Sequence, residues 1–473
     1  MHLLLPRGKK IVFTDWENVA AGYGVAWAGK AGPVPEMMPS GIEIRAFQPT
    51  YTAEPVVVAE QPWESGSINC YATWFEDDGV FRLYYTVYTD DTQGVCRGMM
   101  CYAQSDDGYN WTKPALGVAE FDGSTSNNII LTEAKTHGRG ALGGHVLIDP
   151  TAEPQQRYRM VVGSSDQQSQ FIYAGYSADG TDWTMSEEIL LRHPADTDTV
   201  VFHDDAEQHY KGFFRGRAKD WESHGRRSIC HAVTADFHDW PTPQPCMITD
   251  ANDPPGTDIY TAPAMPWPGA LNAYVMFPAF YPRTADIMET HLAVSRDGRI
   301  WHRPQRAAWL PTGGPDTGHY GIMVAGHGII SPEKGVWAIP VSGDNKTHNQ
   351  GFHEENIRRS QTLEYATIRE DGFMAVEAEA AGEFWTVPLE LEGDHLQLNA
   401  WTHFGGKVAV EVCDEAGKPL AGYSLADTVA LTGDCLFDEV HFQNHENLAE
   451  LKGRPIRLHF RLTRGRLYCF RVA

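Results

Sequence analysis

Ser105-Asp106-Asp107-Gly108-Tyr109-Asn110-Trp111 is the stretch of sequence that decides the fold, because its pattern, Ser-x-Asp-Gly-x-x-Trp, recurs along the chain behind apolar, strand-like runs. Two more copies are intact, at 177–183 and 295–301, and two are degenerate, at 234–240 and 369–373. The aspartates at the third position stand 72, 57, 61 and 74 residues apart. Each interval is long enough for four strands of ordinary length and their loops.

The recurring motif predicts a tight turn that ends in a tryptophan. Its aspartate is suited to bond the nearby backbone, and its glycine to adopt a positive φ. We expect the tryptophan to pack between neighbouring sheets. An earlier turn in each unit, such as Asp77-Asp78-Gly79 in the first, locates the innermost strand directly upstream. Five copies of one four-stranded unit predict a five-bladed β-propeller.

The last part of the chain has a different pattern. Short alternating runs at 394–399, 408–412 and 456–462 indicate a small antiparallel β-sandwich. We therefore expect an all-β protein with a five-bladed β-propeller at 1–380 and a C-terminal β-sandwich at 381–473. The plentiful glycine (45) and proline (29) agree with this class. We expect the sandwich to brace the propeller rather than to bind sugar.

Composition narrows the classes of partner and compartment. The formal net charge of -24 disfavours nucleic acid and anionic membranes, which both require a basic surface. The eight cysteines fit neither a zinc ribbon nor a CxxC pair, so we expect buried free thiols. The N-terminal apolar run is too short for a signal peptide, and no stretch approaches the roughly 20 apolar residues of a membrane span. These features predict a cytoplasmic protein if residue 1 is the native start, and a secreted or periplasmic one otherwise.

Polar residues gather where the innermost strands begin, and in a propeller these positions form one funnel. Acidic groups recur in four of the five segments: Gln61-Pro62-Trp63-Glu64, Gly143-Gly144-His145, Asp196-Thr197-Asp198, Gly256-Thr257-Asp258-Ile259-Tyr260 and Asp316-Thr317-Gly318-His319-Tyr320. Glycoside hydrolysis needs a protonated carboxyl group to donate to the leaving oxygen and an ionised one to attack or to activate water. We expect the catalytic set to be Glu64, Asp198 and Asp258.

The remaining funnel residues are candidates for substrate contact. Aromatic rings are suited to stack on a sugar face, and Arg215 to meet an acidic sugar or to hold a catalytic carboxylate. The candidates are Trp63, His145, Arg215, Tyr260, Asp316, His319 and Tyr320. The competing interpretation is structural, because an aspartate at a strand end is often a turn cap. No metal-ligand spacing occurs, so we expect no catalytic metal or cofactor; a structural calcium ion is compatible with the sequence.

Several segments resemble a bacterial group of five-bladed propeller proteins related to the family 32 and family 43 glycoside hydrolases. They are residues 102–114, 121–130, 292–298, 419–425 and 453–458. The resemblance covers nearly the whole chain and implies a sugar-active propeller, commonly a furanosidase acting from a chain end. The catalytic motifs Trp-Met-Asn-Asp-Pro-Asn, Arg-Asp-Pro and Glu-Cys-Pro of the characterised families are absent. We therefore assign roles by position: Glu64 as general acid, Asp258 as nucleophile or base, and Asp198 as an orienting, pKa-tuning group.

The predicted function is a glycoside hydrolase that cleaves a small oligosaccharide or glycoside. Two alternatives stay open: a carbohydrate-binding propeller without catalysis, favoured by the missing motifs, and a sugar phosphorylase or lyase that uses the same funnel. The sequence predicts neither the sugar, the linkage, the stereochemical outcome nor the oligomeric state, because function depends on the site and not on the fold.

Overall fold

The structure is a computed structural model, and it describes residues 2–21, 37–90, 96–164, 171–194, 198–216, 225–314, 317–350 and 362–473. Its regular structure consists of strands and of the short 3-10 helices η1 (Pro62–Glu64), η2 (Pro154–Gln156) and η3 (Ala449–Leu451). The protein is therefore all-β, as predicted. The chain divides into two compact units: unit 1 holds Met1–Phe47, Trp267–Ala273 and Arg369–Ala473, and unit 2 holds Gln48–Pro266 and Tyr274–Ile368.

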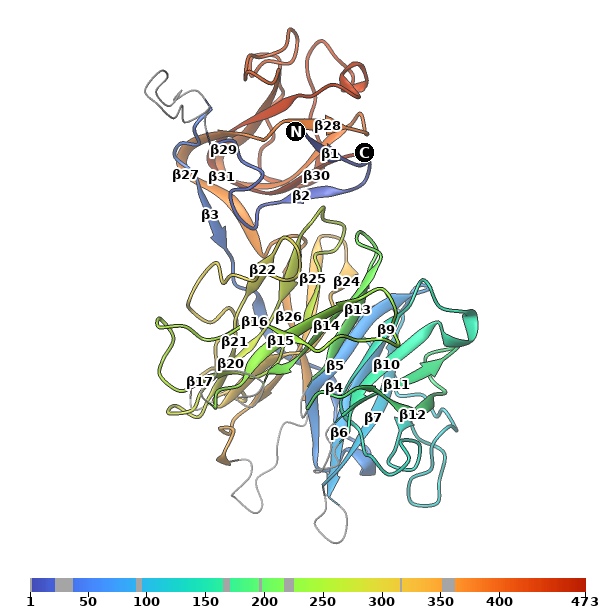
Figure 1. The fold of residues 1–473 in the computed structure, drawn as a ribbon. Helices are drawn as coiled ribbons and strands as arrows, with labels where there is room; N and C mark the ends of the chain where they lie inside the picture. Colours follow the sequence, from blue (N-terminus) through green and yellow to red (C-terminus); the bar gives the residue numbers. More distant parts are fainter. Residues whose placement is uncertain are drawn as a thin grey trace. The chain divides into compact units, whose positions relative to one another are not determined.

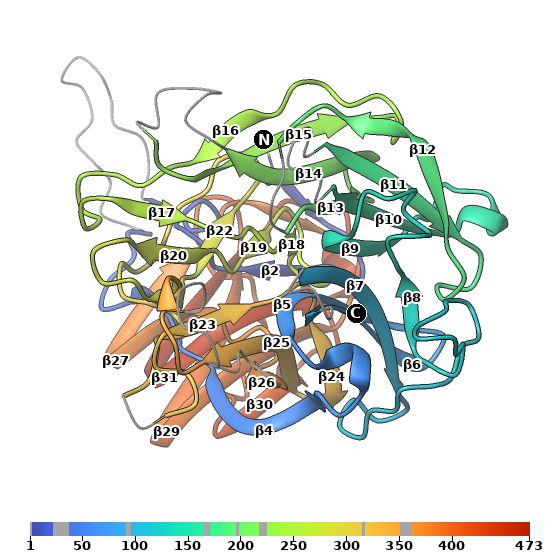
Figure 2. The same cartoon turned by 90° about the horizontal axis from the view of Figure 1, so that it is seen from below.

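Unit 2 contains three four-stranded antiparallel sheets, and in each the strands follow one another in sequence order. The first consists of β5 (Ser67–Asp77), β6 (Val80–Asp90), β7 (Cys96–Ser105) and β8 (Ile129–Leu131). The second consists of β9 (Leu142–Ile148), β10 (Tyr158–Gly163), β11 (Ile172–Ser177) and β12 (Thr184–Leu191). The third consists of β13 (Val200–Asp204), β14 (His209–Gly216), β15 (Ser228–Thr234) and β16 (Gln244–Met247). Figure 2 shows the first strands, β5, β9 and β13, nearer the middle of unit 2 than the last strands, β8, β12 and β16.

The fourth and fifth repeats of unit 2 share their strands between two sheets. One sheet joins β18 (Ala264–Pro266), β19 (Tyr274–Met276) and β22 (Ala293–Ser295). The other has eight strands: β17 (Thr257–Ile259), β20 (Ala279–Pro282), β21 (Met288–Thr290), β23 (Ile322–Ala325), β24 (Ile330–Glu333), β25 (Val336–Asp344), β26 (Thr362–Arg369) and β4 (Thr50–Val58). Strand β4 comes before the first repeat and pairs with β26 at the end of the last one. By strand pairing, the first three repeats are therefore separate sheets, whereas strands of the fourth and fifth repeats belong to one common sheet.

The Ser-x-Asp-Gly motif forms the predicted backbone-capped turn. The Asp107 carboxylate accepts hydrogen bonds from the backbone N–H groups of Tyr109 (2.8 Å) and Asn110 (2.7 Å). Gly108 has a φ of 76°, the left-handed region that favours glycine. The ring of Trp111 stacks on Trp74 with centroids 5.9 Å apart, and its Nε1–H donates to the Tyr365 hydroxyl of β26 at 3.1 Å. The tryptophan thus packs against the neighbouring sheet, as expected.

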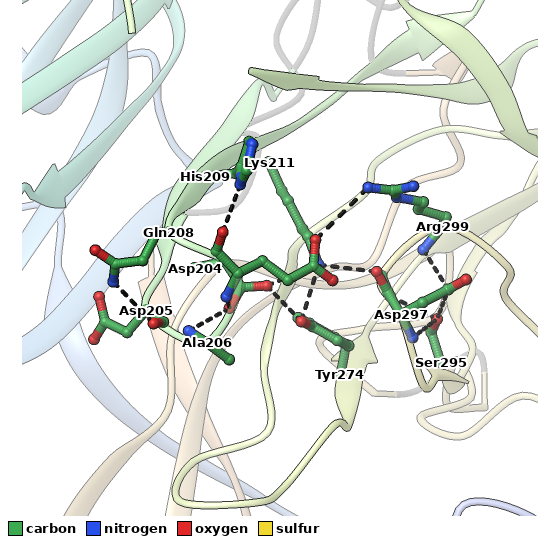
Figure 3. Close-up of polar contacts among 12 residues, drawn as sticks. Asp204, Asp205, Ala206, Gln208, His209, Lys211, Tyr274, Ser295, Asp297 and Arg299 are labelled. Carbon is green, nitrogen blue, oxygen red and sulfur yellow. Dashed lines mark hydrogen bonds and ion pairs between the residues drawn. The ribbon is translucent and has the colours of Figure 1, made fainter. Parts of the chain in front are cut away.

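A buried ion-pair network ties the third sheet of unit 2 to the next (Figure 3). The Lys211 ammonium on β14 pairs with Asp204 at the end of β13 (2.7 Å) and donates to the Tyr274 hydroxyl of β19 (2.9 Å) and the Asp297 carbonyl (2.9 Å). The Tyr274 hydroxyl also donates to Asp204. Lys211 and Asp204 are both buried and have lost their contacts with water. The ion pair between them and the added hydrogen bonds offset the free-energy cost of that desolvation.

The same arrangement occurs at two earlier positions. Asp149, just after β9, pairs with Arg159 of β10 (2.5 Å) and accepts from the Tyr210 hydroxyl of β14 (2.6 Å). Asp77, at the end of β5, accepts from the Tyr158 hydroxyl of β10 and pairs with Arg82 of β6 (3.4 Å). In all three cases an aspartate and a cation of one hairpin bind a tyrosine of the following sheet.

Unit 1 is built around a six-stranded sheet that joins the two ends of the chain (Figure 1). It contains β2 (Lys10–Val12), β3 (Glu43–Ala46), β27 (Met374–Trp385), β29 (Leu396–Cys413), β30 (Asp434–Glu439) and β31 (Arg457–Val472); β1 (Leu3–Leu5) pairs separately with β28 (Leu389–Leu391). Because β2 pairs with β31 and β3 with β27, the first residues group with the C-terminal part. The sequence had placed them with the predicted propeller.

Two other properties bear on the expectations from composition. No helix in the described ranges has the length and apolarity required to cross a membrane. Among the cysteines whose side chains the structure describes, Cys101, Cys230, Cys413, Cys435 and Cys469 are buried free thiols and Cys246 is a half-buried one.

Candidate functional site

Four of the candidate residues lie together in unit 2. Asp198 lies two residues before the start of β13, Arg215 belongs to β14, Asp258 belongs to β17, and Tyr260 follows β17. Arg215 links two of them: its Nη2 donates to the Tyr260 carbonyl oxygen at 2.7 Å, its guanidinium carbon lies 4.1 Å from the centroid of the Tyr260 ring, and its charge acts on Asp198. Asp258 joins through Arg227, which it binds and whose guanidinium carbon lies 5.0 Å from the same ring centroid. We call Asp198, Arg215, Asp258 and Tyr260 the Arg215 cluster.

Asp198 is the carboxyl group of this cluster whose protonation is most changed by burial. Its side chain is buried, with 6% of the residue exposed. Burial raises the pKa of Asp198 from 3.8 to about 7, and the positive charge of Arg215 opposes part of this rise. A carboxyl group with such a pKa is partly protonated at neutral pH, which is the condition for general acid catalysis.

Asp258 is fully buried and its carboxylate is saturated with donors. It accepts from the Arg227 backbone N–H and Nη1, each at 2.7 Å, and from Arg283 Nε at 2.9 Å and Nη2 at 2.8 Å. Two guanidinium groups therefore balance its charge and occupy its lone pairs. This geometry holds Arg227 in place, and it leaves no oxygen of Asp258 open to a sugar.

Tyr260 is surrounded by cationic and aromatic groups. The Arg227 guanidinium carbon lies 5.0 Å from its ring centroid, in addition to Arg215 at 4.1 Å. Its hydroxyl is 3.1 Å from Nε2 of His348, whose ring packs on Tyr281 with centroids 4.7 Å apart. Burial first, and then the charge of Arg227, lower the pKa of His348. The two cations already contact the ring that was expected to stack on a sugar.

Glu64 belongs to a different network. It ends η1, is fully buried, and accepts hydrogen bonds from the backbone N–H groups of Glu60 (3.0 Å) and Gln61 (3.1 Å), Lys113 Nζ (2.7 Å) and the Tyr85 hydroxyl (2.7 Å). Within the described residues, neither a hydrogen bond nor an ion pair links Glu64 to Asp198 or Asp258. Its donors come from the first repeat of unit 2, so the carboxylate anchors η1 to that sheet.

Trp63 takes part in the same network as Glu64. Its Nε1–H donates to the Asn128 side-chain oxygen at 2.9 Å, and its ring meets Phe121 with centroids 5.9 Å apart. The Asn128 amide in turn donates to the Tyr85 hydroxyl at 2.8 Å. Through these contacts, Trp63 and Glu64 fix η1, which precedes β5, to the first repeat.

His145 meets a histidine that the sequence did not single out. The rings of His145, on β9, and His327, after β23, make an edge-to-face contact with centroids 4.2 Å apart. Neither ring nitrogen of His145 has a hydrogen-bond partner in the described part of the chain. Burial keeps the pKa of His145 well below its usual value and lowers that of His327 to about 4, so both rings are neutral at pH 7.

A close backbone approach marks the position of His327. A side chain at Gly328 would meet the Trp74 carbonyl oxygen at 2.0 Å, and Gly328 has a φ of 107°. Because Gly328 permits this close approach, the tripeptide Gly326-His327-Gly328 is the sequence signal that could have pointed to His327.

The fifth segment of the predicted funnel makes contacts of its own. The His319 ring packs on Tyr51 of β4 with centroids 4.5 Å apart, and burial lowers the pKa of His319. Tyr320 is exposed. Asp316 lies outside the described residues. The structure thus brings Asp198, Arg215, Asp258 and Tyr260 together, while Trp63 with Glu64, His145 with His327, and His319 with Tyr51 form separate contacts.

Two sets of residues were missed by sequence reasoning: the arginines that bind Asp258, and His348. Arg227 and Arg283 stand in connections between strands, and no local pattern connects either of them to Asp258. In the described ranges, no group of three or more His, Cys, Asp or Glu side chains is placed to hold a metal ion.

Comparison with known proteins gives a distant structural likeness. No family model and no curated protein matches the chain. A solved structure named "Glycoside hydrolase" is similar at 15% identity and a TM-score of 0.49, covering 68% of this chain and 92% of that one. A β-1,2-mannobiose phosphorylase from Listeria innocua is similar at 11% identity and a TM-score of 0.47, covering 70% and 98%. A structure reported for glycoside hydrolases of the GH130 family that target β-1,2-mannosidic linkages in Candida mannan is similar at 12% identity and a TM-score of 0.46, covering 76% and 96%.

Proposed function

We propose that the chain is a carbohydrate-active enzyme, a glycoside hydrolase that protonates the leaving oxygen of a glycoside with Asp198. The observation that carries the proposal is the buried carboxyl group of Asp198: burial raises its pKa to about 7 against the positive charge of Arg215, which itself binds Tyr260. Breaking a glycosidic bond requires a proton on the leaving oxygen, and a group with a pKa near the working pH is the most effective donor.

We also propose that unit 2 is a five-bladed propeller. Three repeats are separate four-stranded sheets, and the fifth gains β4 as an added strand through its pairing with β26. An aromatic residue stands at the first or second position of the strand after the first hairpin turn in every repeat: Phe81, Tyr158, Tyr210, Tyr274 and Trp337. This recurrence supports five copies of one unit, including the two repeats that share sheets.

The other members of the Arg215 cluster assist Asp198. Arg215 stabilises the carboxylate that remains after proton transfer, because an opposite charge nearby favours the ionised form. Asp258, held by two arginines, positions Arg227 beside Tyr260. Glu64 anchors η1 and is assigned no chemical step. The proposed substrate is a carbohydrate. More specifically, we propose a furanoside that is cleaved from a chain end, so furanosides belong in the test.

The test is hydrolysis of a panel of nitrophenyl furanosides, nitrophenyl pyranosides and oligosaccharides, with and without inorganic phosphate. We expect Asp198→Asn to lower kcat by about 10²–10⁴-fold, the usual range for general acid catalysis. Asp205→Asn is the matched control, because this exposed carboxylate in the β13–β14 turn lies outside the Arg215 cluster. Turnover that depends on phosphate would replace hydrolysis by phosphorolysis, and a wild type inactive on the whole panel would leave a binding role.

A further inference from the structure

The Arg215 cluster has a proton donor and needs a group that attacks the anomeric carbon. The usual partner is a second carboxylate. The oxygens of Asp258 are occupied by four donors from Arg227 and Arg283, and Glu64 is engaged in the η1 network. Arg215, whose charge acts on Asp198, also binds Tyr260, and the phenol of Tyr260 is a nucleophilic side chain of this cluster.

Tyr260 is paired with a base at the distance that nucleophilic catalysis requires. Its hydroxyl lies 3.1 Å from Nε2 of His348, within the range typical of a nucleophile and its general base. The base is itself oriented: the His348 ring packs on Tyr281, and the His348 backbone N–H donates to the Asp286 carbonyl oxygen at 3.1 Å. Nucleophile, base and orienting group are thus all present.

The charges around the ring favour a reactive phenol. Arg215 and Arg227 hold their guanidinium carbons 4.1 Å and 5.0 Å from the ring centroid. Positive charges this close stabilise the negative charge that develops on the tyrosine in the transition states of attack and departure. The Asp258 carboxylate keeps Arg227 at this position, which gives the buried ion pair a role in the reaction.

We propose that Tyr260 is the catalytic nucleophile and His348 its general base, with Asp198 as acid; this inference rests on the proposed function. In the first step the Tyr260 oxygen bonds to the anomeric carbon and its proton passes to His348 Nε2. The bond from that carbon to the leaving oxygen breaks, and the leaving oxygen takes the proton of Asp198.

In the second step, water replaces the tyrosine. The Asp198 carboxylate accepts a proton from water, and the water oxygen bonds to the anomeric carbon. The bond to the Tyr260 oxygen breaks, and the phenol regains its proton from His348. One glycoside and one water become two hydroxyl compounds, and no oxidant, reductant or metal is consumed. Two displacements at one carbon retain the anomeric configuration.

The experiment compares wild type with Asp198→Asn and Tyr260→Phe on two substrates of the same sugar, one with a nitrophenyl and one with a dinitrophenyl leaving group. Dinitrophenolate departs without a proton. With this substrate the first step, in which the leaving group departs, should therefore be fast again in Asp198→Asn and stay slow in Tyr260→Phe. We expect Tyr260→Phe to lower kcat at least about 10³-fold on both substrates with little change in KM. Tyr109→Phe, which removes an exposed hydroxyl, is the matched control.

Trapping identifies the bond directly. A fluorosugar fluoride of the accepted sugar should label wild type, and peptide mass spectrometry should find the sugar on Tyr260. A label on a carboxylate, inversion of configuration by NMR, or Tyr260→Phe within tenfold of wild type would each overturn the inference. If these results accompany a collapse in Asp198→Asn, the proposed hydrolase stands and only the nucleophile is wrong; a wild type without turnover overturns both.

Discussion

At the scale of single residues, Asp198 should give the protein a distinctive pH dependence. Its pKa is about 7 when folded and 3.8 as the ordinary value, so the folded state binds the proton more tightly. Its contribution to stability is therefore complete below pH 4 and is lost as the pH rises towards 7, on the order of 4 kcal/mol in all.

The Asp198→Asn variant removes this contribution. We expect the free energy of unfolding of Asp198→Asn, relative to wild type, to increase between pH 4 and 7 and then to level off. Urea unfolding at a series of pH values measures it, with Asp205→Asn as the control. Parallel curves for wild type and Asp198→Asn would show that Asp198 titrates normally.

Asp258 offers a second test at this scale. Replacing it by alanine leaves Arg227 and Arg283 without their shared partner, and we expect a loss of about 2–4 kcal/mol, because a buried ion pair broken on one side is costly. Asp250 pairs with Arg306 at 2.7 Å at the surface, so Asp250→Ala should cost less than about 1 kcal/mol. Equal losses in chemical denaturation would contradict the positioning role of Asp258.

At the scale of strands and hairpins, the Lys211 network should be a strong link between sheets. Lys211→Met leaves the buried Asp204 without its cation, and we expect a loss of about 3–5 kcal/mol. Adding Asp204→Asn to Lys211→Met should restore part of that loss, because the uncompensated charge disappears. A double-mutant cycle by urea unfolding measures the coupling. Additive losses would mean that the two side chains stabilise the fold independently.

The sequence predicted those elements whose signal is local. Each Ser-x-Asp-Gly turn is capped by its own aspartate, so the motif itself encodes the conformation. The pairing of β4 with β26 has no such signal, because the partner of an edge strand is set by distant hydrophobic contacts. The same reason explains why β2 and β3 were not expected beside β31 and β27.

The site followed the same rule. Asp198 and Asp258 were found because acidic residues recur just before or at the innermost strands. Their different environments were not visible, since Arg227 and Arg283 reach Asp258 from connections elsewhere in the fold. Sequence position grouped Glu64 with Asp198 and Asp258, although Glu64 belongs to the separate η1 network, and only the side-chain contacts distinguish the candidate acid from the anchored carboxylates.

At the scale of the whole molecule, the division into two units predicts two separate responses to damage in the core. Phe13 lies fully buried in unit 1 against Phe384, with centroids 5.6 Å apart. Phe213 lies fully buried in unit 2 against Trp301, with centroids 5.7 Å apart. The two residues belong to hydrophobic clusters that share no member. Replacement by alanine should cost about 3–5 kcal/mol in either case, because a large cavity is left.

Hydrogen exchange followed by mass spectrometry locates the damage. Phe13→Ala should accelerate exchange in β27 and β31 and leave β5 to β7 protected, whereas Phe213→Ala should do the reverse, since exchange reports the opening of each cooperative region separately. Equal acceleration in both units from either substitution would mean that the chain opens as one cooperative body. In that case the places where the chain passes from one unit to the other, such as Phe47 to Gln48 and Ile368 to Arg369, would couple the two cores.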